Sequence, residues 1–81
     1  MATNRASSFG STDNGILTRV PGQYIGTAVS QCPDASTAQS DTHPVEIDAG
    51  YVGRVLITCQ RMRERRFGNW FWCAVRADRI D

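Results

Sequence analysis

The stretch from Arg54 to Arg76 constrains the fold of this 81-residue chain more than any other part. It reads RVLITCQRMRERRFGNWFWCAVR and holds both tryptophans, two of the three cysteines and six of the nine arginines. Two apolar, β-prone runs flank Gly68-Asn69, and such a pair between two such runs is typical of a hairpin turn. We therefore expect an antiparallel β-hairpin in this part of the chain.

A two-residue loop at Gly68-Asn69 predicts which side chains share a face of the hairpin. Phe67 then faces Trp70, and Arg65 faces Trp72. A four-residue loop keeps these faces, whereas a three-residue loop exchanges them. On the core side of this hairpin we place Leu56, Met62, Phe71, Cys73 and Val75.

Two features of the first half of this stretch compete with a regular strand. Val55, Ile57 and Cys59 fall on the arginine side, so the strand needs a bulge near Cys59-Gln60 or has to pass from core to surface. Alternatively, residues 51–66 form a helix, because apolar residues there also recur at helical spacing. That alternative gives an α+β fold.

The part before Arg54 is milder and more polar. Residues 1–15 are rich in Ser, Thr, Asn and Gly, and we expect a disordered arm there. Residues 16–20 and 23–31 are interpreted as short strands separated by a Pro-Gly turn. Residues 32–44 contain two prolines and no hydrophobic period, which predicts an exposed, mobile loop.

Residues 45–51 alternate cleanly between apolar and polar side chains. Val45, Ile47, Ala49 and Tyr51 share one side, which is typical of a half-buried strand. With the strands above, this predicts one all-β or β-dominated domain over residues 16–81. We favour a small SH3-like or OB-like barrel of four to five short strands, because closure removes exposed edges.

The charge is divided unevenly between the two halves of the chain. The net charge is +1 and no lysine is present. Residues 1–53 carry two arginines and five acids, whereas residues 54–79 carry seven arginines and two acids. Such an asymmetry indicates an anionic partner or self-association. The N-terminal residues contain no apolar signal-peptide core and no long apolar run follows, so we expect a cytoplasmic protein that does not bind membranes.

Residues suited to catalysis or metal binding are few and badly spaced. Cys32, His43, Cys59 and Cys73 are separated by ten or more residues, and no Cys-x-x-Cys pair is present. No phosphate-binding glycine loop and no serine elbow occurs. We expect no metal, no cofactor and no enzymatic activity, and we expect Cys59 and Cys73 to be small buried apolar residues.

The combination of arginine and tryptophan gives the functional prediction. Guanidinium groups neutralise phosphates and indole rings stack on bases, so we expect a non-catalytic binding module for an anionic partner, foremost nucleic acid. The alternative is a protein partner or a homo-oligomer that uses the same surface, because tryptophan and arginine are enriched at binding hot spots. The predicted surface consists of Arg61, Arg63, Arg65, Trp70, Trp72 and Arg76.

Overall fold

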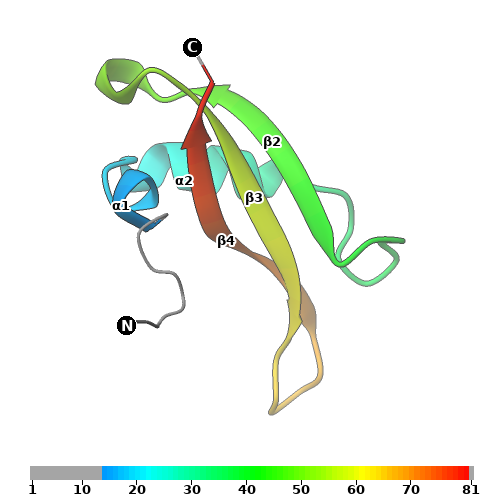
Figure 1. The fold of residues 1–81 in the computed structure, drawn as a ribbon. Helices are drawn as coiled ribbons and strands as arrows, with labels where there is room; N and C mark the ends of the chain where they lie inside the picture. Colours follow the sequence, from blue (N-terminus) through cyan, green and yellow to red (C-terminus); the bar gives the residue numbers. More distant parts are fainter. Residues whose placement is uncertain (1–13, 81) are drawn as a thin grey trace, which may run out of the picture.

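The fold is that of a computed structural model, which describes residues 14–80 (Figure 1). The expected arm over residues 1–15 therefore lies outside the described residues except for its last two, which belong to the first helix. In chain order the elements are α1 (Asn14–Leu17), α2 (Gly22–Ser30), β2 (Thr42–Asp48), the 3-10 turn η2 (Gly50–Val52), β3 (Arg54–Arg63) and β4 (Trp70–Arg79).

The three strands form one antiparallel sheet in the order β2-β3-β4. The prediction of a β-dominated fold is confirmed, but the sheet is open and has three strands rather than closing into a barrel of four to five. Helix α2 lies behind the sheet in Figure 1 and covers one of its faces. No helix within residues 14–80 lies over the opposite face, which we call the uncovered face.

The two strands predicted in the N-terminal half are wrong, because residues 16–20 lie in α1 and the turn after it, and residues 23–31 lie almost entirely in α2. In a strand, Ile25, Thr27 and Val29 would share one face, and this alternation is the pattern that predicts a strand here. The structure instead packs Tyr24, Ile25 and Val29 against the core, with Ala28 completely buried among them. This spacing of one, three and one residues is that of a helical face.

Strand β2 follows its predicted pattern. Val45 and Ile47 are buried and Glu46 is exposed, which confirms the half-buried strand. Tyr51 departs from the pattern and is 86% exposed, because β2 ends at Asp48. The Asp48 carboxylate accepts a hydrogen bond from the Gly50 N–H, and Gly50 has a φ of 66°, so the chain turns before Tyr51 can continue the alternation.

Strands β3 and β4 form the predicted hairpin, and no helix exists over residues 51–66. The loop has six residues instead of two, since Arg63 faces Trp70. A backbone hydrogen bond of 2.7 Å from Glu64 N to Asn69 O, and one of 3.0 Å from Gly68 N to Glu64 O, close this longer loop. Between the loop and the bulge described below, the pairing is shifted by four positions from the predicted one, and because four is even the same residues share a face there. Beyond the bulge the faces are exchanged, so Arg76 leaves the face of Arg61 and Arg63.

The assignment of the two faces to core and solvent is wrong. The face that carries Trp72 is the core face, because Val55, Ile57 and Cys59 lie on it and are completely buried. The predicted core residues Met62, Phe71 and Val75, each more than a third exposed, and the half-buried Leu56 and Cys73 lie on the uncovered face or at the bulge described below. The buried apolar residues are Val20, Ala28, Ala35, Val45, Ile47, Ala49, Val52, Val55, Ile57, Cys59, Trp72 and Ala77.

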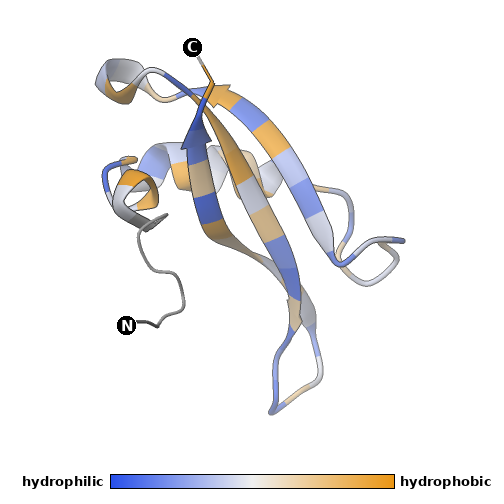
Figure 2. Ribbon diagram, in the orientation of Figure 1, coloured by the Kyte–Doolittle hydropathy of each residue, from blue (hydrophilic) through white to orange (hydrophobic). Residues whose placement is uncertain are grey.

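A bulge lies beside Cys59, close to the predicted position, but its extra residue is in β4 and not in β3. Strand β3 therefore keeps one phase, and Val55, Ile57 and Cys59 stay on the side of Arg61 and Arg63. Thr58 faces Arg76, whereas the next residue of β3, Cys59, faces Ala74. Val75 is therefore the inserted residue of β4. Figure 2 shows apolar and polar residues alternating along β2, whereas β3 has a continuous apolar run directly after its first residue.

Candidate binding hairpin

The β3–β4 hairpin extends beyond the end of β2, the remaining strand of the sheet (Figure 1). The ladder between β2 and β3 ends at the pair Thr42–Gln60, and the Asp41 carbonyl then accepts a hydrogen bond of 2.7 Å from the Arg61 N–H. After this point the two strands of the hairpin pair only with each other. We call residues 63–70 the hairpin tip, and Arg61 with Trp72 the hairpin base.

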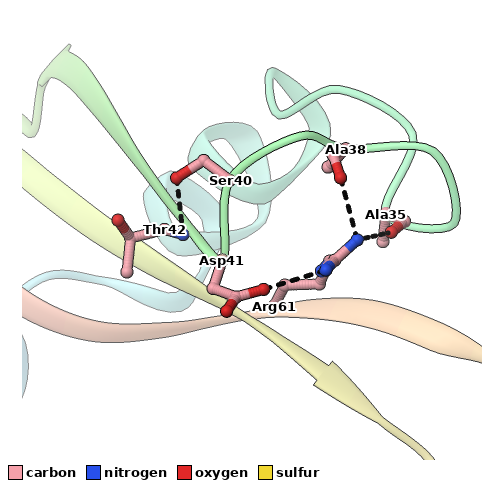
Figure 3. Close-up of polar contacts among 6 residues, drawn as sticks. All are labelled: Ala35, Ala38, Ser40, Asp41, Thr42 and Arg61. Carbon is pink, nitrogen blue, oxygen red and sulfur yellow. Dashed lines mark hydrogen bonds and ion pairs between the residues drawn. The ribbon is translucent and has the colours of Figure 1, made fainter.

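Arg61 in the hairpin base is committed to the loop before β2 (Figure 3). Its Nη1 donates to the carbonyl oxygens of Ala35 at 3.2 Å and Ala38 at 2.9 Å. Its Nη2 donates to Asp41 Oδ1 at 2.9 Å, and the side chain is only 19% exposed. The structure therefore gives Arg61 a role in holding this loop against the sheet, with its charge compensated by Asp41.

Trp72, facing Arg61 across the hairpin, is committed in the same way. The ring is buried, and Nε1 donates a hydrogen bond of 2.6 Å to the Pro33 carbonyl oxygen. The His43 ring lies 6.0 Å from it between centroids. Arg61 and Trp72 thus anchor the segment that we expected to be a mobile loop over residues 32–44, and residues 42–44 of that segment belong to β2.

Trp70 lies where the hairpin base passes into the tip. Its ring is 38% exposed, and the guanidinium carbons of Arg61 and Arg63 lie 4.4 Å and 5.4 Å from its centroid. Two cation–π contacts of this kind are each worth about 0.5–1 kcal/mol at an exposed site. They fix the orientation of an indole ring that still contacts solvent.

The remainder of the tip is cationic and exposed. Arg63 Nε donates to the Gly68 carbonyl oxygen at 3.1 Å, and Glu64 Oε1 accepts a hydrogen bond of 3.2 Å from the Phe67 N–H. Arg65 and Arg66 are exposed, and the Arg66 guanidinium lies 5.5 Å from the Phe67 ring centroid. Phe67 itself is 73% exposed. The tip therefore presents three guanidinium groups against one carboxylate.

Arg76 lies apart from the other predicted site residues. It faces Thr58 on the uncovered side of the sheet, and its Nε lies 3.0 Å from Asp78 Oδ2. Of the six predicted residues, the structure brings Arg61, Arg63, Trp70 and Trp72 to one face and places Arg65 in the loop beyond them.

Sequence reasoning missed four residues near the tip. Arg66 and Phe67 are not among the predicted surface residues, and Met62 and Phe71 are among the predicted core residues. The signal that locates Met62 and Phe71 is the apolar run Val55, Ile57 and Cys59 on the opposite parity, which identifies the covered face.

Burial and hydrogen bonds shift the pKa of one cysteine, Cys59, and of one aspartate, Asp34. Burial, followed by a hydrogen bond with Cys32, raises the pKa of the Cys59 thiol to about 12. Cys59 is therefore protonated at neutral pH and is a poor nucleophile. Hydrogen bonds from the Ser36 hydroxyl and then the Ser36 N–H lower the pKa of Asp34, which stabilises its turn.

The described part of the chain contains neither a candidate metal site nor a membrane-spanning helix. Among residues 14–80, no three His, Cys, Asp or Glu side chains are grouped closely enough to hold a metal ion. No helix in this described part of the chain is long and apolar enough to cross a membrane. Comparisons with protein-family models, with curated proteins and with solved structures found no match to this chain.

Proposed function

We propose that this protein is a non-catalytic binding module for nucleic acid and that the hairpin tip makes the contact. The observation that carries this proposal is the placement of Arg63, Arg65 and Arg66 within four residues at the end of a protruding hairpin. The one carboxylate beside them, Glu64, is oriented by the Phe67 N–H. An anion that approaches this end meets a net positive charge.

The distribution of the acids supports the tip as the anion-binding end. Asp41 binds Arg61, Glu46 lies 2.7 Å from Arg54, and Asp78 binds Arg76. By contrast, neither Arg65 nor Arg66 forms an ion pair with any residue in the range 14–80. Their side chains can bind phosphates without breaking an ion pair within this range, so nucleic acid binding is compatible with the fold.

Salt dependence gives the proposal a quantitative form. Each phosphate that an arginine neutralises releases counterions, and the logarithm of affinity falls with the logarithm of salt concentration by about 0.7 per contact on single strands. Three tip arginines therefore predict a slope of about −2. Fluorescence anisotropy of a labelled oligonucleotide, titrated at several salt concentrations, measures this slope.

The test removes two guanidinium groups from the tip. The double variant Arg65→Ala/Arg66→Ala should bind the oligonucleotide at least about tenfold more weakly at low salt. The matched control is Arg54→Ala/Arg79→Ala, which removes the same charge from the opposite end of the sheet and should retain most of the affinity. Equal affinities of the two double variants would contradict the proposal.

A protein partner is the second candidate, and the exposed aromatic residues of the tip favour it. Phe67 and Trp70 next to arginines are the residue types enriched at binding hot spots. Such an interface depends on the rings and only weakly on salt. Trp70→Ala should then dissociate a complex or a homo-oligomer detected by light scattering, with little change between low and high salt.

A further inference from the structure

The uncovered face of the sheet carries an exposed apolar patch that borders the hairpin tip. Met62 and Phe71 face each other across β3 and β4 and are 41% and 45% exposed. In the sequence they are the direct neighbours of Arg63 and Trp70. Val75, at the bulge of β4, extends the exposed apolar surface toward the centre of the sheet and is 36% exposed.

This face changes its chemistry along the length of the strands. At the end far from the tip it carries Glu46, Asp48 and Asp78 together with Arg54 and Arg76, and the ion pairs Glu46–Arg54 and Arg76–Asp78 occupy it. An anionic partner is disfavoured at that end. Along the strands, the apolar patch therefore lies between the loop that carries Arg65 and Arg66 and this end with its acids, while Arg63 and Trp70 point to the opposite face.

We propose that the pair Met62–Phe71 stacks on unpaired bases of a single-stranded nucleic acid whose phosphates lie on the hairpin tip. This inference rests on the proposed function and specifies its ligand. Aromatic side chains stack on any base face, whereas a duplex presents phosphates and base edges and keeps its base faces stacked inside. An exposed phenylalanine next to a cationic loop suits a ligand with accessible base faces as well as phosphates.

Neighbouring side chains on the same face fit this ligand. On the uncovered face, Gln60 is the next residue of β3 before Met62, two positions earlier in the sequence, and it faces Cys73. Gln60 is exposed, so its amide can donate to and accept from base edges. The thioether of Met62 adds a flexible apolar contact beside the ring of Phe71. The sheet thus separates two tasks, with phosphates bound at the tip and bases at the uncovered face.

The experiment compares a fluorescein-labelled oligothymidylate of about 15 nucleotides, close to the upper site size of small single-strand binders, with a blunt duplex of equal length. Each is titrated with the parent protein and with Phe71→Ala. Stacking on one aromatic ring predicts a loss of about tenfold in single-strand affinity for Phe71→Ala. Phe71→Trp should retain the parent affinity, because an indole ring also stacks. The parent should bind the duplex more weakly than the single strand, and Phe71→Ala should bind the duplex as tightly as the parent does.

Tyr51→Ala is the matched control, since Tyr51 is an exposed aromatic residue outside the hairpin. It should bind the single strand as the parent does. Thermal melting of every variant confirms that it is folded. If Phe71→Ala is poorly folded, Phe71→Leu provides the test, because leucine keeps an apolar side chain there but has no ring to stack, so it should lose single-strand affinity as Phe71→Ala does.

The outcomes separate this inference from the proposed function. If Phe71→Ala binds as the parent does, or if the duplex binds as tightly as the single strand, the inference fails while a phosphate contact at the tip stands. If no oligonucleotide binds at all, both fail. Self-association of the parent that Phe71→Ala abolishes, without oligonucleotide binding, would assign the patch to a second copy of the chain and would also overturn both.

Discussion

The hairpin base and the hairpin tip contain the same kinds of residue but use them in opposite ways. In the base, the Arg61 guanidinium binds two carbonyl oxygens and a carboxylate, and Trp72 donates to Pro33 O. In the tip, Arg65 and Arg66 are exposed and Trp70 keeps contact with solvent. Residue type therefore does not decide whether an arginine or a tryptophan is structural or available for a partner.

The difference arises from what covers each region. The segment 33–41 lies against the base and supplies its carbonyl groups and Asp41, whereas neither this segment nor β2 pairs with the tip. Proteins keep buried charges where they are paired and hydrogen-bonded, and Arg61 meets this condition at Nη1 and Nη2 through its three partners. Its Nε is buried without a hydrogen-bond partner among residues 14–80. Arg63, two residues further along β3, belongs to the hairpin tip, and its guanidinium group contributes charge to the surface.

The largest effect that tests this comparison is expected from the two tryptophans. Trp72→Ala removes a buried ring and its hydrogen bond, and should lower the free energy of unfolding by about 3–5 kcal/mol, enough to unfold a chain of this size. Trp70→Ala should lower it by about 1–2 kcal/mol, through two cation–π contacts and partial burial. Thermal unfolding followed by circular dichroism measures both, and equal losses would remove the distinction between base and tip.

The arginines of the two regions should differ next. Arg61→Ala deletes three hydrogen bonds of a charged donor and should destabilise the fold by about 2–4 kcal/mol. Hydrogen exchange in residues 33–41 should become faster, because their anchor is lost. Arg65→Ala should stay within about 0.5 kcal/mol of the parent. Slow exchange of that segment in folded Arg61→Ala would show that Trp72 alone anchors it.

The pH dependence of stability tests the burial of Cys59 on the covered face of the sheet. The pKa of Cys59 is raised in the folded chain from 9.0 to about 12, so above pH 9 the unfolded chain releases this proton first. Stability is therefore fully present below about pH 9 and falls as the pH rises toward 12, with a loss of roughly 1 kcal/mol by pH 10. Urea unfolding at pH 8 and pH 10 measures the slope. Cys59→Ala should reduce it, and an unchanged slope in Cys59→Ala would show that another group titrates.

The smallest expected effect concerns a glycine at the tip. Gly68 has a φ of 75°, and a Cβ there would lie 3.1 Å from Arg63 Nη2. Gly68→Ala should therefore cost about 1 kcal/mol. The control is Gly26→Ala in α2, which has open space around the new Cβ and should stabilise the helix by up to about 1 kcal/mol. Chemical denaturation that shows the same sign for both would refute the role of the loop conformation.

Part of this fold could be predicted from the sequence, and the physical reasons for the rest are specific. The alternation of Val45, Glu46 and Ile47 predicted β2, and the two β-prone runs around Gly68 predicted the hairpin. The faces of the hairpin could not be assigned from Trp70–Val75 alone, because both faces of that run are apolar. The buried run on β3 decides them, since α2 covers the side that carries Ile57.

The candidate site shows the same limit. The sequence located arginines and tryptophans in one hairpin, and the parity that puts Arg61 and Arg63 beside Trp70 was correct. What it could not show is that the polar segment 33–41 folds back on Arg61 and Trp72. That contact joins residues more than twenty positions apart and depends on backbone carbonyl groups, which leave no trace in residue types.

The bulge at Val75 has a consequence for how this sequence can vary. Before it, the even-numbered residues Trp72 and Ala74 point to the core side, and after it the odd-numbered Ala77 does. The strand thus contains a phase change. The loss of Val75 itself would remove the bulge and leave Arg76 facing Thr58 and Ala77 facing Ile57, so both faces of the sheet would be kept. An added residue between Arg76 and Ala77 would instead move Ala77 to the uncovered face and turn the Asp78 carboxylate toward the core. This strand therefore tolerates a shorter sequence at its bulge but not a longer one beyond it.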